Sequence, residues 1–547
     1  MYNLDSLSLK FLIEENADFL NGAVVQKIQM PSRREILLSM RNLGENRKFY
    51  INLNPKFPHL NFITQKPLYA FKIPQEPPMF CMLLRKHLEG AKLSRVQVVE
   101  YERIVELYFD IYDEIGSKTP MCLALELMGK HSNAVLYNAK NKIIAGCLHN
   151  ISPEKSSVRE IWGGVNYIYP PKQDKTDILR TSISEFYTLS DVEISSRYYY
   201  LSKGLTDFTL ESAAAQGFID DRAKLFSYLQ NIIAGKTTVV RDFWIKNLEN
   251  EGISLDMSDI RCLNPLIEVY FSNFVMKDLL EKKKKTLETL VAKEISRLNS
   301  VLQNADKKTS YLAYKQLGEL ILANIYKIPE GAEKITLEGA EIRLDPFKTP
   351  AQNAQTFFGL YSKGKTAHDV ATVRAKEAQN TLEYLNSVLF TIKNADKPEF
   401  LDEIADEMTD FTGNSGAAVL KPRGVQKSAK SKEKLNVQTI VHEGFELLLG
   451  KNNKQNDYLI KKLSSPEDIW FHALGCPSSH VFVRTENGRK QVPDSVLLYA
   501  AKLVKQNSPM RESAKASIIY TKRKYLKRPP DTHLAYVTYR EEKEIVV

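Results

Sequence analysis

The sequence from 467 to 484 reads Glu467-Asp468-Ile469-Trp470-Phe471-His472-Ala473-Leu474-Gly475-Cys476-Pro477-Ser478-Ser479-His480-Val481-Phe482-Val483-Arg484. Asp468, Trp470 and His472 alternate with apolar residues, so in an extended strand their side chains share one face while Ile469, Phe471 and Ala473 face a core. A Pro-Ser-Ser turn follows, and His480 opens a second strand. The stretch therefore predicts two neighbouring strands that bring two imidazoles close together.

The surrounding C-terminal region has the pattern of an α+β domain. Its expected elements are a strand pair over Thr439–Leu449 turning at Glu443-Gly444, a polar loop over Gly450–Asp457, a helix over Ser495–Val504, and final strands over Ser517–Tyr520 and Ala535–Tyr539. The segment Tyr520–Arg528 mixes tyrosines with Lys522, Arg523 and Lys524. Charge for phosphate and rings for base stacking suit looped or single-stranded RNA, and an exposed basic hairpin is the alternative.

Composition bounds the class of protein. At 547 residues the chain is too long for one core, and roughly 100–200 residues per domain predicts about three to five units. There is neither an apolar run of about 18 residues nor a secretory leader, and the five cysteines form no C-x-x-C pair. We therefore expect no membrane span, disulfide framework, metal or cofactor, and a cytoplasmic location. The net charge of +10 favours a polyanionic partner, although a basic soluble protein remains the alternative.

The N-terminal 173 residues mix helix and strand signals. Helices are expected over Leu4–Leu20 and Met79–Gly90, and strands over Ala23–Ile28, Glu35–Met40, Lys48–Leu53, Leu60–Ile63, Leu93–Val99, Ile104–Ile111, Met121–Leu127 and Ala134–Tyr137. Residues 174–263 look helical. Leu201-Ser202-Lys203-Gly204-Leu205, before a helix over Thr209–Ala215, suits a helix-hairpin-helix turn whose amides hold a phosphate, and a plain helical connector is the alternative.

The sequence pattern of residues 264–395 predicts two long helices that pair with each other. Apolar residues recur at three- and four-residue steps from Leu287 to Leu302 and again from Val370 to Ile392, in a charged background. A helix over Tyr311–Asn324 and a hairpin over Ile335–Leu344 lie between them. About 30 helical residues reach roughly 45 Å, so the arm could extend to a second site, or it could be a solvated stalk. Residues 396–434, acidic and then basic, are predicted to be a flexible linker.

Several of these segments resemble motifs of the NFACT family, which includes bacterial RqcH and eukaryotic NEMF proteins; fibronectin-binding protein A is an older name for some members. The family's D-x-W-x-H and P-G-S-H-V core resembles the opening stretch, with Ser478 in place of Gly. Its D-R-I motif resembles Glu102-Arg103-Ile104, with Glu in place of Asp. Further resemblances are to L-R-K-H-L at 84–88, G-K-H-S-N at 129–133, G-E-L-x-x-A-N at 318–324, L-D-P at 344–346, N-A-Q at 353–355 and G-R-N-N-x-Q-N-D at 450–457.

The resemblance covers nearly the whole chain and implies a multidomain α+β fold. The implied parts are a glycosylase-like N-terminal α/β domain (1–173), a helix-hairpin-helix domain (174–263), a long antiparallel coiled coil with a middle insert (264–395), the linker (396–434) and a C-terminal α+β RNA-binding domain (435–547).

The implied function is ribosome quality control. Such proteins bind a large ribosomal subunit obstructed by peptidyl-tRNA, recruit tRNA, in bacteria mainly alanyl-tRNA, and promote template-free C-terminal tailing that marks the nascent chain for degradation. Peptide-bond formation stays with the ribosome, so no catalytic residue is expected. By resemblance, the tRNA-binding residues are Asp5, Arg85, Lys86, His87, Glu102, Arg103, Lys130 and His131, and the C-terminal RNA-binding set is Asp468, Trp470, His472, His480, Lys522, Arg523 and Lys524.

Three alternatives accompany this interpretation. Asp468, Trp470 and His472 could form a structural polar cluster around a buried indole. The chain could be a surface adhesin with fibronectin as its partner, which the missing leader and anchor argue against. It could also be a DNA glycosylase, but those enzymes need an N-terminal proline amine and a four-cysteine zinc finger, whereas residue 2 is Tyr2 and no cysteine cluster exists.

Overall fold

The computed structural model describes residues 3–64, 71, 73–112, 118–154, 156–254, 260–306, 311–412, 435, 437–529 and 533–547. These residues divide into two compact units, one ending at Asp278 and the other beginning at Leu279. Each unit is described by itself below.

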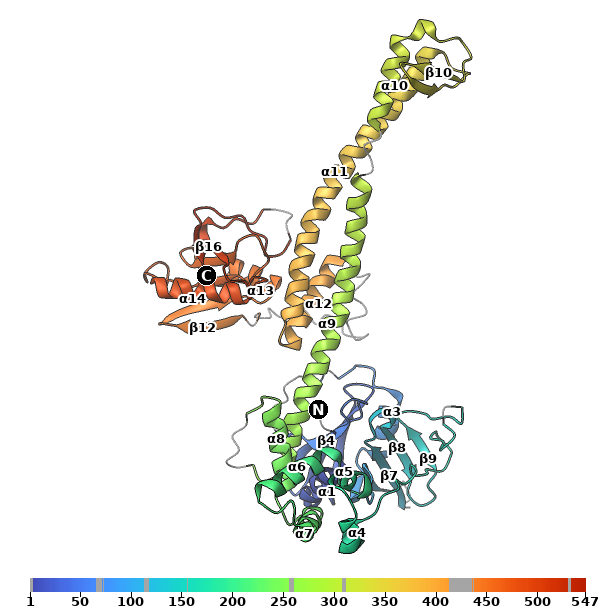
Figure 1. Ribbon diagram of the computed structural model, residues 1–547, viewed down its shortest axis with the longest axis vertical. Coiled ribbons are helices and arrows are strands. Elements are labelled where there is room, and N and C mark those ends of the chain that lie inside the picture. The colour runs from blue at the N-terminus through green and yellow to red at the C-terminus, as the bar shows by residue number, and fades with distance from the viewer. Residues whose placement is uncertain are drawn as a thin grey trace. The chain divides into compact units, whose positions relative to one another are not determined.

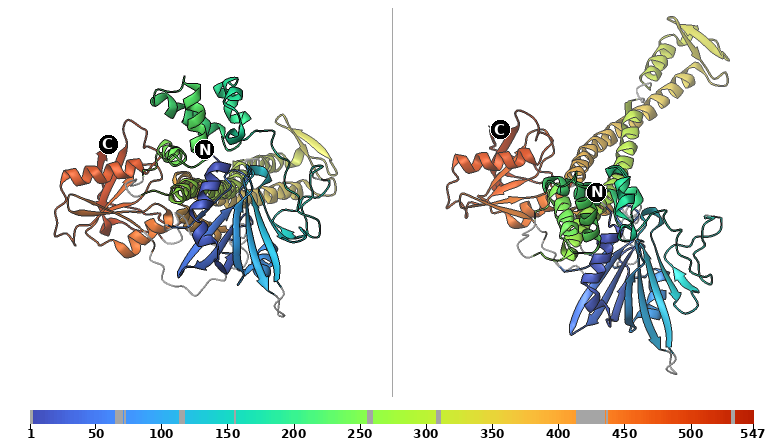
Figure 2. Two further views of the ribbon diagram at one scale, coloured as in Figure 1. Left: turned by 90° about the horizontal axis from the view of Figure 1, so that it is seen from below. Right: turned by 60° about the horizontal axis from the view of Figure 1, so that its bottom comes forward.

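The first unit is built on an antiparallel sheet. Its strands follow the order β4-β3-β2-β1-β5-β6-β7-β8-β9, and Figure 2 shows them in blue and cyan. The bounds are β1 Val24–Gln29, β2 Glu35–Asn42, β3 Glu45–Asn52, β4 His59–Phe62, β5 Lys92–Val98, β6 Ile104–Tyr112, β7 Lys118–Glu126, β8 Asn133–Asn138 and β9 Ile144–Cys147. The strand predictions between Ala23 and Tyr137 are confirmed, and β9 is an additional strand.

Helices cover this sheet and its ends. The first predicted helix is divided at Asn16 into α1 (Ser6–Glu15) and α2 (Ala17–Leu20), while α3 spans Met79–Leu88. A helical group follows, with α4 Ile183–Tyr187, α5 Asp191–Arg197, α6 Lys203–Ala215, α7 Arg222–Ile233 and α8 Val239–Asn250. The fully buried Trp244 of α8 donates its indole N–H to Ser8 Oγ of α1 at 2.9 Å. This bond joins the helical group to the start of the chain.

The long helix α9 (Leu263–Asp306) begins in the first unit. Its first amide, on Leu263, donates to both carboxylate oxygens of Glu15 at 3.0 and 2.9 Å, as an acid at a helix N-terminus should. Phe271 stacks on His59 of β4 with 4.4 Å between ring centroids. These contacts fix the root of α9 on the sheet.

The second unit contains two long helices that run side by side (Figure 1), α9 and α11 (Pro350–Asn394). Leu287, Val291 and Leu298 of α9 share one apolar cluster with Leu382 and Leu385 of α11. Between them lie α10 (Tyr311–Ala323) and the hairpin of β10 (Lys334–Leu337) and β11 (Ala340–Arg343). The middle insert therefore has its own small core, built around Ile321, Ile342 and Ala354.

The C-terminal part of the second unit is a sheet in the order β12-β13-β15-β14-β16-β17. The bounds are β12 Gln438–His442, β13 Phe445–Leu449, β14 Ile469–Ala473, β15 Val481–Val483, β16 Ser517–Lys522 and β17 Lys543–Val546. Helix α14 (Asp494–Gln506) packs on the face that carries Phe471 and Ala473, whereas Trp470 belongs to a second cluster. An apolar cluster therefore packs on each face of β14.

Two predictions in the second unit are corrected. The acidic half of the expected linker is helix α12 (Pro398–Thr412), because Leu401, Ile404 and Met408 recur at helical spacing and are buried against α9 and α11. The basic half, 413–434, lies outside the described residues. The expected last strand over Ala535–Tyr539 is also wrong. Ala535 has a left-handed φ of 63°, and β16 pairs instead with β17.

Candidate nucleic-acid interface

A cavity of about 540 Å³ in the first unit gathers several of the predicted residues. Arg103 immediately precedes β6, so its side chain is carried to the end of the sheet. The cavity is lined by Asn3, Asp5, Ser6, Tyr101, Arg103, Gln173, Lys175, Tyr199, Tyr200, Leu201, Ser202, Lys203, Gly204, Asp207 and Phe243. Residues up to 240 positions apart in the chain thus share one concave site, which holds three cationic and two acidic side chains.

Asp5 is buried and its carboxylate is used inside the protein. One oxygen caps α1 by accepting from the Ser8 amide at 2.7 Å, and the other accepts from Ser202 Oγ at 3.1 Å. Burial raises the pKa of Asp5, while these hydrogen bonds and the charge of Arg103 lower it. Asp5 therefore joins the N-terminus of α1 to the cap of α6 and faces Arg103, which makes it a positioning residue.

The N-terminus of α6 forms one wall of the cavity. Ser202 caps this helix, and Lys203 and Gly204 occupy its first turn. The glycine predicted for the helix-hairpin-helix turn therefore lies inside α6. Unpaired amides and the positive end of a helix dipole attract anions, and Lys203 and Arg103 add full charges beside them. This wall has the chemistry to hold a phosphate.

Aromatic rings also line the cavity. Tyr101 stacks on Tyr199 with 4.2 Å between centroids and a 15° interplanar angle, and the Tyr101 hydroxyl donates to Asp177 at 2.9 Å. Tyr101 and Tyr200 both have left-handed backbones, with φ of 67° and 66°. Aromatic faces beside cationic groups are the surface on which unstacked bases pack.

Glu102 and Arg103 have partly buried, mutually facing charges. Burial raises the pKa of Glu102, whereas the Gln173 side chain and Arg103 lower it. Burial lowers the pKa of Arg103 from its usual value, and the negative charges of Asp5 and Glu102 oppose that shift. Arg103 is thus a partly desolvated guanidinium, a state in which a charge-assisted contact to phosphate or base is stronger than in open water.

The other predicted tRNA-binding residues lie elsewhere on the unit. Arg85, Lys86 and His87 occupy the last turn of α3, where Arg85 donates to the Ile28 carbonyl at 2.9 Å. Only Lys86 is fully exposed there. His87 lines a separate cavity of about 450 Å³ beside Ile143 and Asn138, and burial lowers its pKa. The structure does not bring these residues into the Arg103 cavity.

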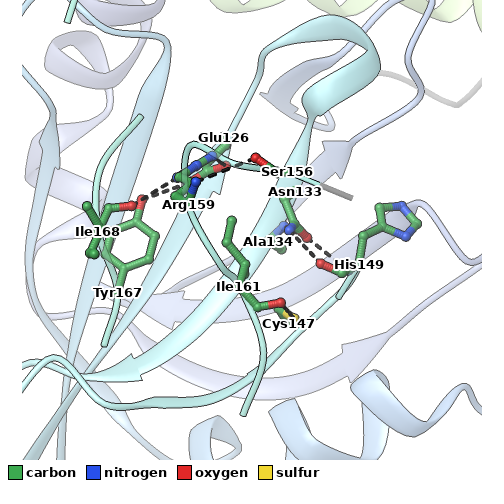
Figure 3. Close-up of polar contacts among 10 residues, drawn as sticks. All are labelled: Glu126, Asn133, Ala134, Cys147, His149, Ser156, Arg159, Ile161, Tyr167 and Ile168. Atoms are coloured by element: carbon green, nitrogen blue, oxygen red, sulfur yellow. Dashed lines mark hydrogen bonds and ion pairs between the residues drawn. The ribbon is translucent and has the colours of Figure 1, made fainter. Parts of the chain in front are cut away.

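Lys130 and His131 are exposed in a short turn of 3₁₀ helix (Gly129–His131) between β7 and β8. The turn is held by Asn133, whose amide donates to the His149 carbonyl at 2.9 Å and whose Oδ1 accepts from the His149 amide at 3.0 Å (Figure 3). The asparagine of this motif is therefore structural, whereas the lysine and histidine face outward.

Two buried carboxylates in the same sheet were missed by the sequence analysis. Glu126 accepts hydrogen bonds from the two terminal guanidinium nitrogens of Arg159, at 2.7 and 2.6 Å, and from the Tyr167 hydroxyl at 2.9 Å (Figure 3). Glu106 accepts from Gln97 and from the hydroxyls of three tyrosines, Tyr108, Tyr137 and Tyr169. In the sequence, the one indication of these buried networks was that Glu106 and Glu126 stand at strand positions that face the core, with Tyr167 and Tyr169 available as hydroxyl donors.

In the C-terminal sheet, Trp470, His472 and His480 form the predicted cluster. Trp470 stacks on His472 at 5.5 Å, and the two imidazoles meet edge to face at 5.1 Å. Burial lowers the pKa of His472 to about 4 and that of His480 well below its usual value. Neutral rings of this kind pack the domain.

Asp468 is 1% exposed and organises the loops next to β14. Its oxygens accept from the Ser465 amide at 2.7 Å and the Thr485 amide at 3.0 Å. Asp468 is therefore a structural residue of these loops, and its hydrogen bonds go to Ser465 and Thr485 rather than to Trp470 or His472.

The basic segment divides into inward and outward residues. Arg523 donates twice to the Ile460 carbonyl, at 3.2 and 2.8 Å, and Tyr520 stacks on Phe471 in the core. Lys522 and Lys524 are exposed and pair with Glu467. Of the three predicted residues the two lysines therefore face outward, and Lys527 is exposed as well.

Comparison with known proteins finds matches over nearly the whole chain. The family model described as NFACT N-terminal and middle domains matches residues 5–413, and that described as NFACT protein RNA binding domain matches residues 437–535. The chain belongs to the NFACT family. Rqc2 homolog RqcH of Bacillus subtilis is 27% identical, covering 100% of this chain and 98% of that relative. The protein of the same name from Streptococcus suis is 29% identical with the same coverage.

Solved structures that match include the N-terminal part of the fibronectin/fibrinogen-binding protein from Streptococcus suis. It is 25% identical and covers 41% of this chain and 84% of that one, with a TM-score of 0.36. The C-terminal part of the same protein is 27% identical and covers 49% and 94%, with a TM-score of 0.36.

The two departures from NFACT motifs have different structural settings. The left-handed residue in the turn after β14 is Gly475, with φ of 72°, and Ser478 instead accepts the Ala473 amide through its hydroxyl at 3.0 Å. A serine is therefore compatible with this turn. Glu102 has its carboxylate beside Gln173 and Arg103, which line the cavity, but is not itself a lining residue.

Within the described ranges, no helix has the length and apolarity to cross a bilayer, and no group of three or more His, Cys, Asp or Glu side chains could hold a metal.

Proposed function

We propose that this NFACT protein is a ribosome quality-control factor. It binds large ribosomal subunits obstructed by peptidyl-tRNA, recruits tRNA and promotes template-free C-terminal tailing of the nascent chain. The observation that carries the proposal is the match to RqcH relatives over the full length of both chains, together with an RNA-binding domain at 437–535. Full-length similarity matters because each part of such a factor contacts a different component.

The Arg103 cavity supports a tRNA-binding role for the first unit. Arg103, Lys203 and the start of α6 supply positive charge for phosphate, and the stacked Tyr101 and Tyr199 supply an aromatic surface for a base. In this proposal the glycosylase-like N-terminal fold and the helix-hairpin-helix element are scaffolds for the site. The finer assignment to alanyl-tRNA comes from the resemblance alone.

The coiled coil and the C-terminal domain would contact the large subunit. α11 has 45 residues, which corresponds to roughly 67 Å of helix. The small core at the end of this arm can therefore engage a site remote from the root of the helices.

The proposed contribution is positioning rather than bond chemistry. Holding a tRNA and an obstructed subunit together raises the effective concentration of the reacting groups, and the ribosome forms the peptide bond. We assign no catalytic residue. The proposed location is the cytoplasm, where ribosomes and tRNA are present.

The first experiment identifies the RNA that accompanies the protein. The intact chain is purified from its host at low salt, and the bound RNA is sequenced. We expect tRNA and large-subunit rRNA to be enriched over a mock purification. A preparation that carries neither would refute the proposal.

The second experiment tests the cavity. Arg103→Ala and Glu102→Ala should reduce bound tRNA without reducing large-subunit rRNA, because the arm and C-terminal domain are unchanged. Loss of a charged hydrogen bond predicts a decrease of about tenfold or more for Arg103→Ala. Arg47→Ala is the matched control, since Arg47 is an ion-paired arginine on β3 outside the cavity lining. Unchanged tRNA in both cavity variants would exclude this site.

A further inference from the structure

Three side chains on the surface of the C-terminal domain form a clamp, Lys522 and Lys524 on either side of Glu467. Lys522 Nζ lies 2.8 Å from Glu467 Oε2, and Lys524 Nζ lies 2.8 Å from Glu467 Oε1. Each carboxylate oxygen thus accepts one lysine. The two ammonium groups hold a flat, two-oxygen anion between them.

The backbone builds this arrangement. The Arg523 amide donates to the Asp468 carbonyl at 2.8 Å, and the Lys524 amide donates to the Pro466 carbonyl at 2.9 Å. The backbone that carries the lysines is therefore bonded to the residues immediately before and after Glu467. Arg523 points inward to the Ile460 carbonyl. The lysines that flank it in sequence are therefore left on the outside, opposite Glu467.

Stability alone gives a weak reason for the clamp. The lysine side chains are 49% and 39% exposed and Glu467 is 29% exposed, and ion pairs in such settings contribute little to folding. The three side chains together carry a net charge of +1, and the nearby Glu541 carboxylate also acts on Lys524. The arrangement is one in which the anion between the lysines can be exchanged for another.

We propose that Lys522 and Lys524 are a phosphate-binding pair for the backbone of single-stranded RNA, and that Glu467 occupies this site as a built-in competitor until RNA displaces it. A phosphodiester offers two charged oxygens in place of the two carboxylate oxygens. Tyr525 is half-buried next to the pair, with Lys524 Nζ 5.4 Å from its ring centre, and gives an adjacent surface for a base. The proposal rests on the RNA-binding function proposed above and specifies how that binding is restrained.

The displacement is competitive rather than acid-driven. The two lysines lower the pKa of Glu467 to about 2, so its carboxylate stays charged at neutral pH. RNA must therefore replace a charged group, which weakens binding and makes it selective for ligands that offer several phosphates at once.

The test uses the full-length chain and a fluorescein-labelled single-stranded RNA 12-mer, with binding measured by anisotropy from 50 to 200 mM salt. Glu467→Gln removes the competitor's charge and leaves both lysines. Glu446→Gln is the matched control, because Glu446 is an exposed acid of the same domain paired with the single cation Arg484 at 3.4 Å. Both variants change the net charge by the same amount.

We expect Glu467→Gln to bind RNA about two- to fivefold more tightly at 50 mM salt, and its salt dependence to steepen by about 0.7 in log–log slope, equivalent to one additional phosphate contact. Adding Lys522→Gln and Lys524→Gln to that variant should abolish the gain. Glu446→Gln should bind like the wild type.

Unchanged or weaker binding by Glu467→Gln, or an equal gain in Glu446→Gln, would overturn the inference while leaving the RNA-binding function intact. Absence of RNA binding in the wild type and in every variant would instead refute the proposed function, and the inference with it. Thermal melting of each variant checks that the fold is retained.

Discussion

The buried ion pair between Glu126 and Arg159 provides a strong test of how the first unit is held together. Glu126 is fully buried and Arg159 is 8% exposed, with two charge-assisted hydrogen bonds between them. Arg159→Met would leave a carboxylate without its cation inside the protein. Removing one partner of a buried pair costs about 3–5 kcal/mol. Tyr167 would keep its bond to Glu126 and limit the loss only partly.

Hydrogen exchange read out by mass spectrometry is the suitable assay, because a chain of two units need not unfold in one step. A decrease of about 3–5 kcal/mol in the free energy of unfolding predicts roughly 150- to 5,000-fold faster exchange for amides of β7 and β8 that exchange through unfolding of the first unit. The double variant Glu126→Gln with Arg159→Met has no stranded charge and should recover much of this protection. If the double variant exchanges as fast as the single variant, the charge argument is refuted and lost packing is the cause.

Further predictions concern the pH dependence of stability at His59 and glycine-to-alanine substitutions in α11. Burial lowers the pKa of His59 to about 4, so on acidification the unfolded chain is protonated at this histidine before the folded chain is. The free energy of unfolding therefore falls by on the order of 3 kcal/mol as the pH falls from about 6.5 toward 4. His59→Phe, which can still pack on Phe271, should remove this acid sensitivity from hydrogen exchange in β4. Gly364→Ala should destabilise the α10–α11 contact, because its new Cβ would meet Tyr311 Cβ at 2.2 Å. Gly359→Ala, which meets nothing within 4 Å, should stabilise α11 by up to about 1 kcal/mol, and thermal melting followed by circular dichroism compares the two.

Local patterns were sufficient for most of the sheets. Alternation of apolar and polar residues located β1 to β8, and the period-two pattern at Asp468, Trp470 and His472 gave the correct faces of β14. The second apolar cluster that covers the face opposite α14 could not be predicted, because a sequence does not show which segments pack on a strand.

Errors arose where composition outweighed spacing. The acids of 396–412 suggested a linker, yet Leu401, Ile404 and Met408 had the helical period that α12 uses. The acids have partners in α13 (Asn453–Tyr458) and its cap. Glu403 accepts from Asn452 and Gln455.

The candidate site was only partly predictable. Glu102 and Arg103 were identified through a family motif, but nothing local indicates that Tyr101 stacks on Tyr199, or that Asp5 contacts the cap of α6. Those contacts join segments about 100 and 200 residues apart, and single-sequence patterns do not record such pairings. Lys522 and Lys524 were predicted to bind RNA and that role stays a prediction, whereas their carboxylate partner Glu467 was not anticipated.

The left-handed backbones of Tyr101 and Tyr200 bear on how the cavity could evolve. An L-residue in this conformation is about 1 kcal/mol less stable than glycine would be, and both positions could accept glycine without moving the chain. Mutation toward glycine would therefore relax the backbone while deleting the ring. For Tyr101 the stack on Tyr199 and the hydrogen bond to Asp177 oppose that relaxation, so the ring is kept at a cost in backbone conformation.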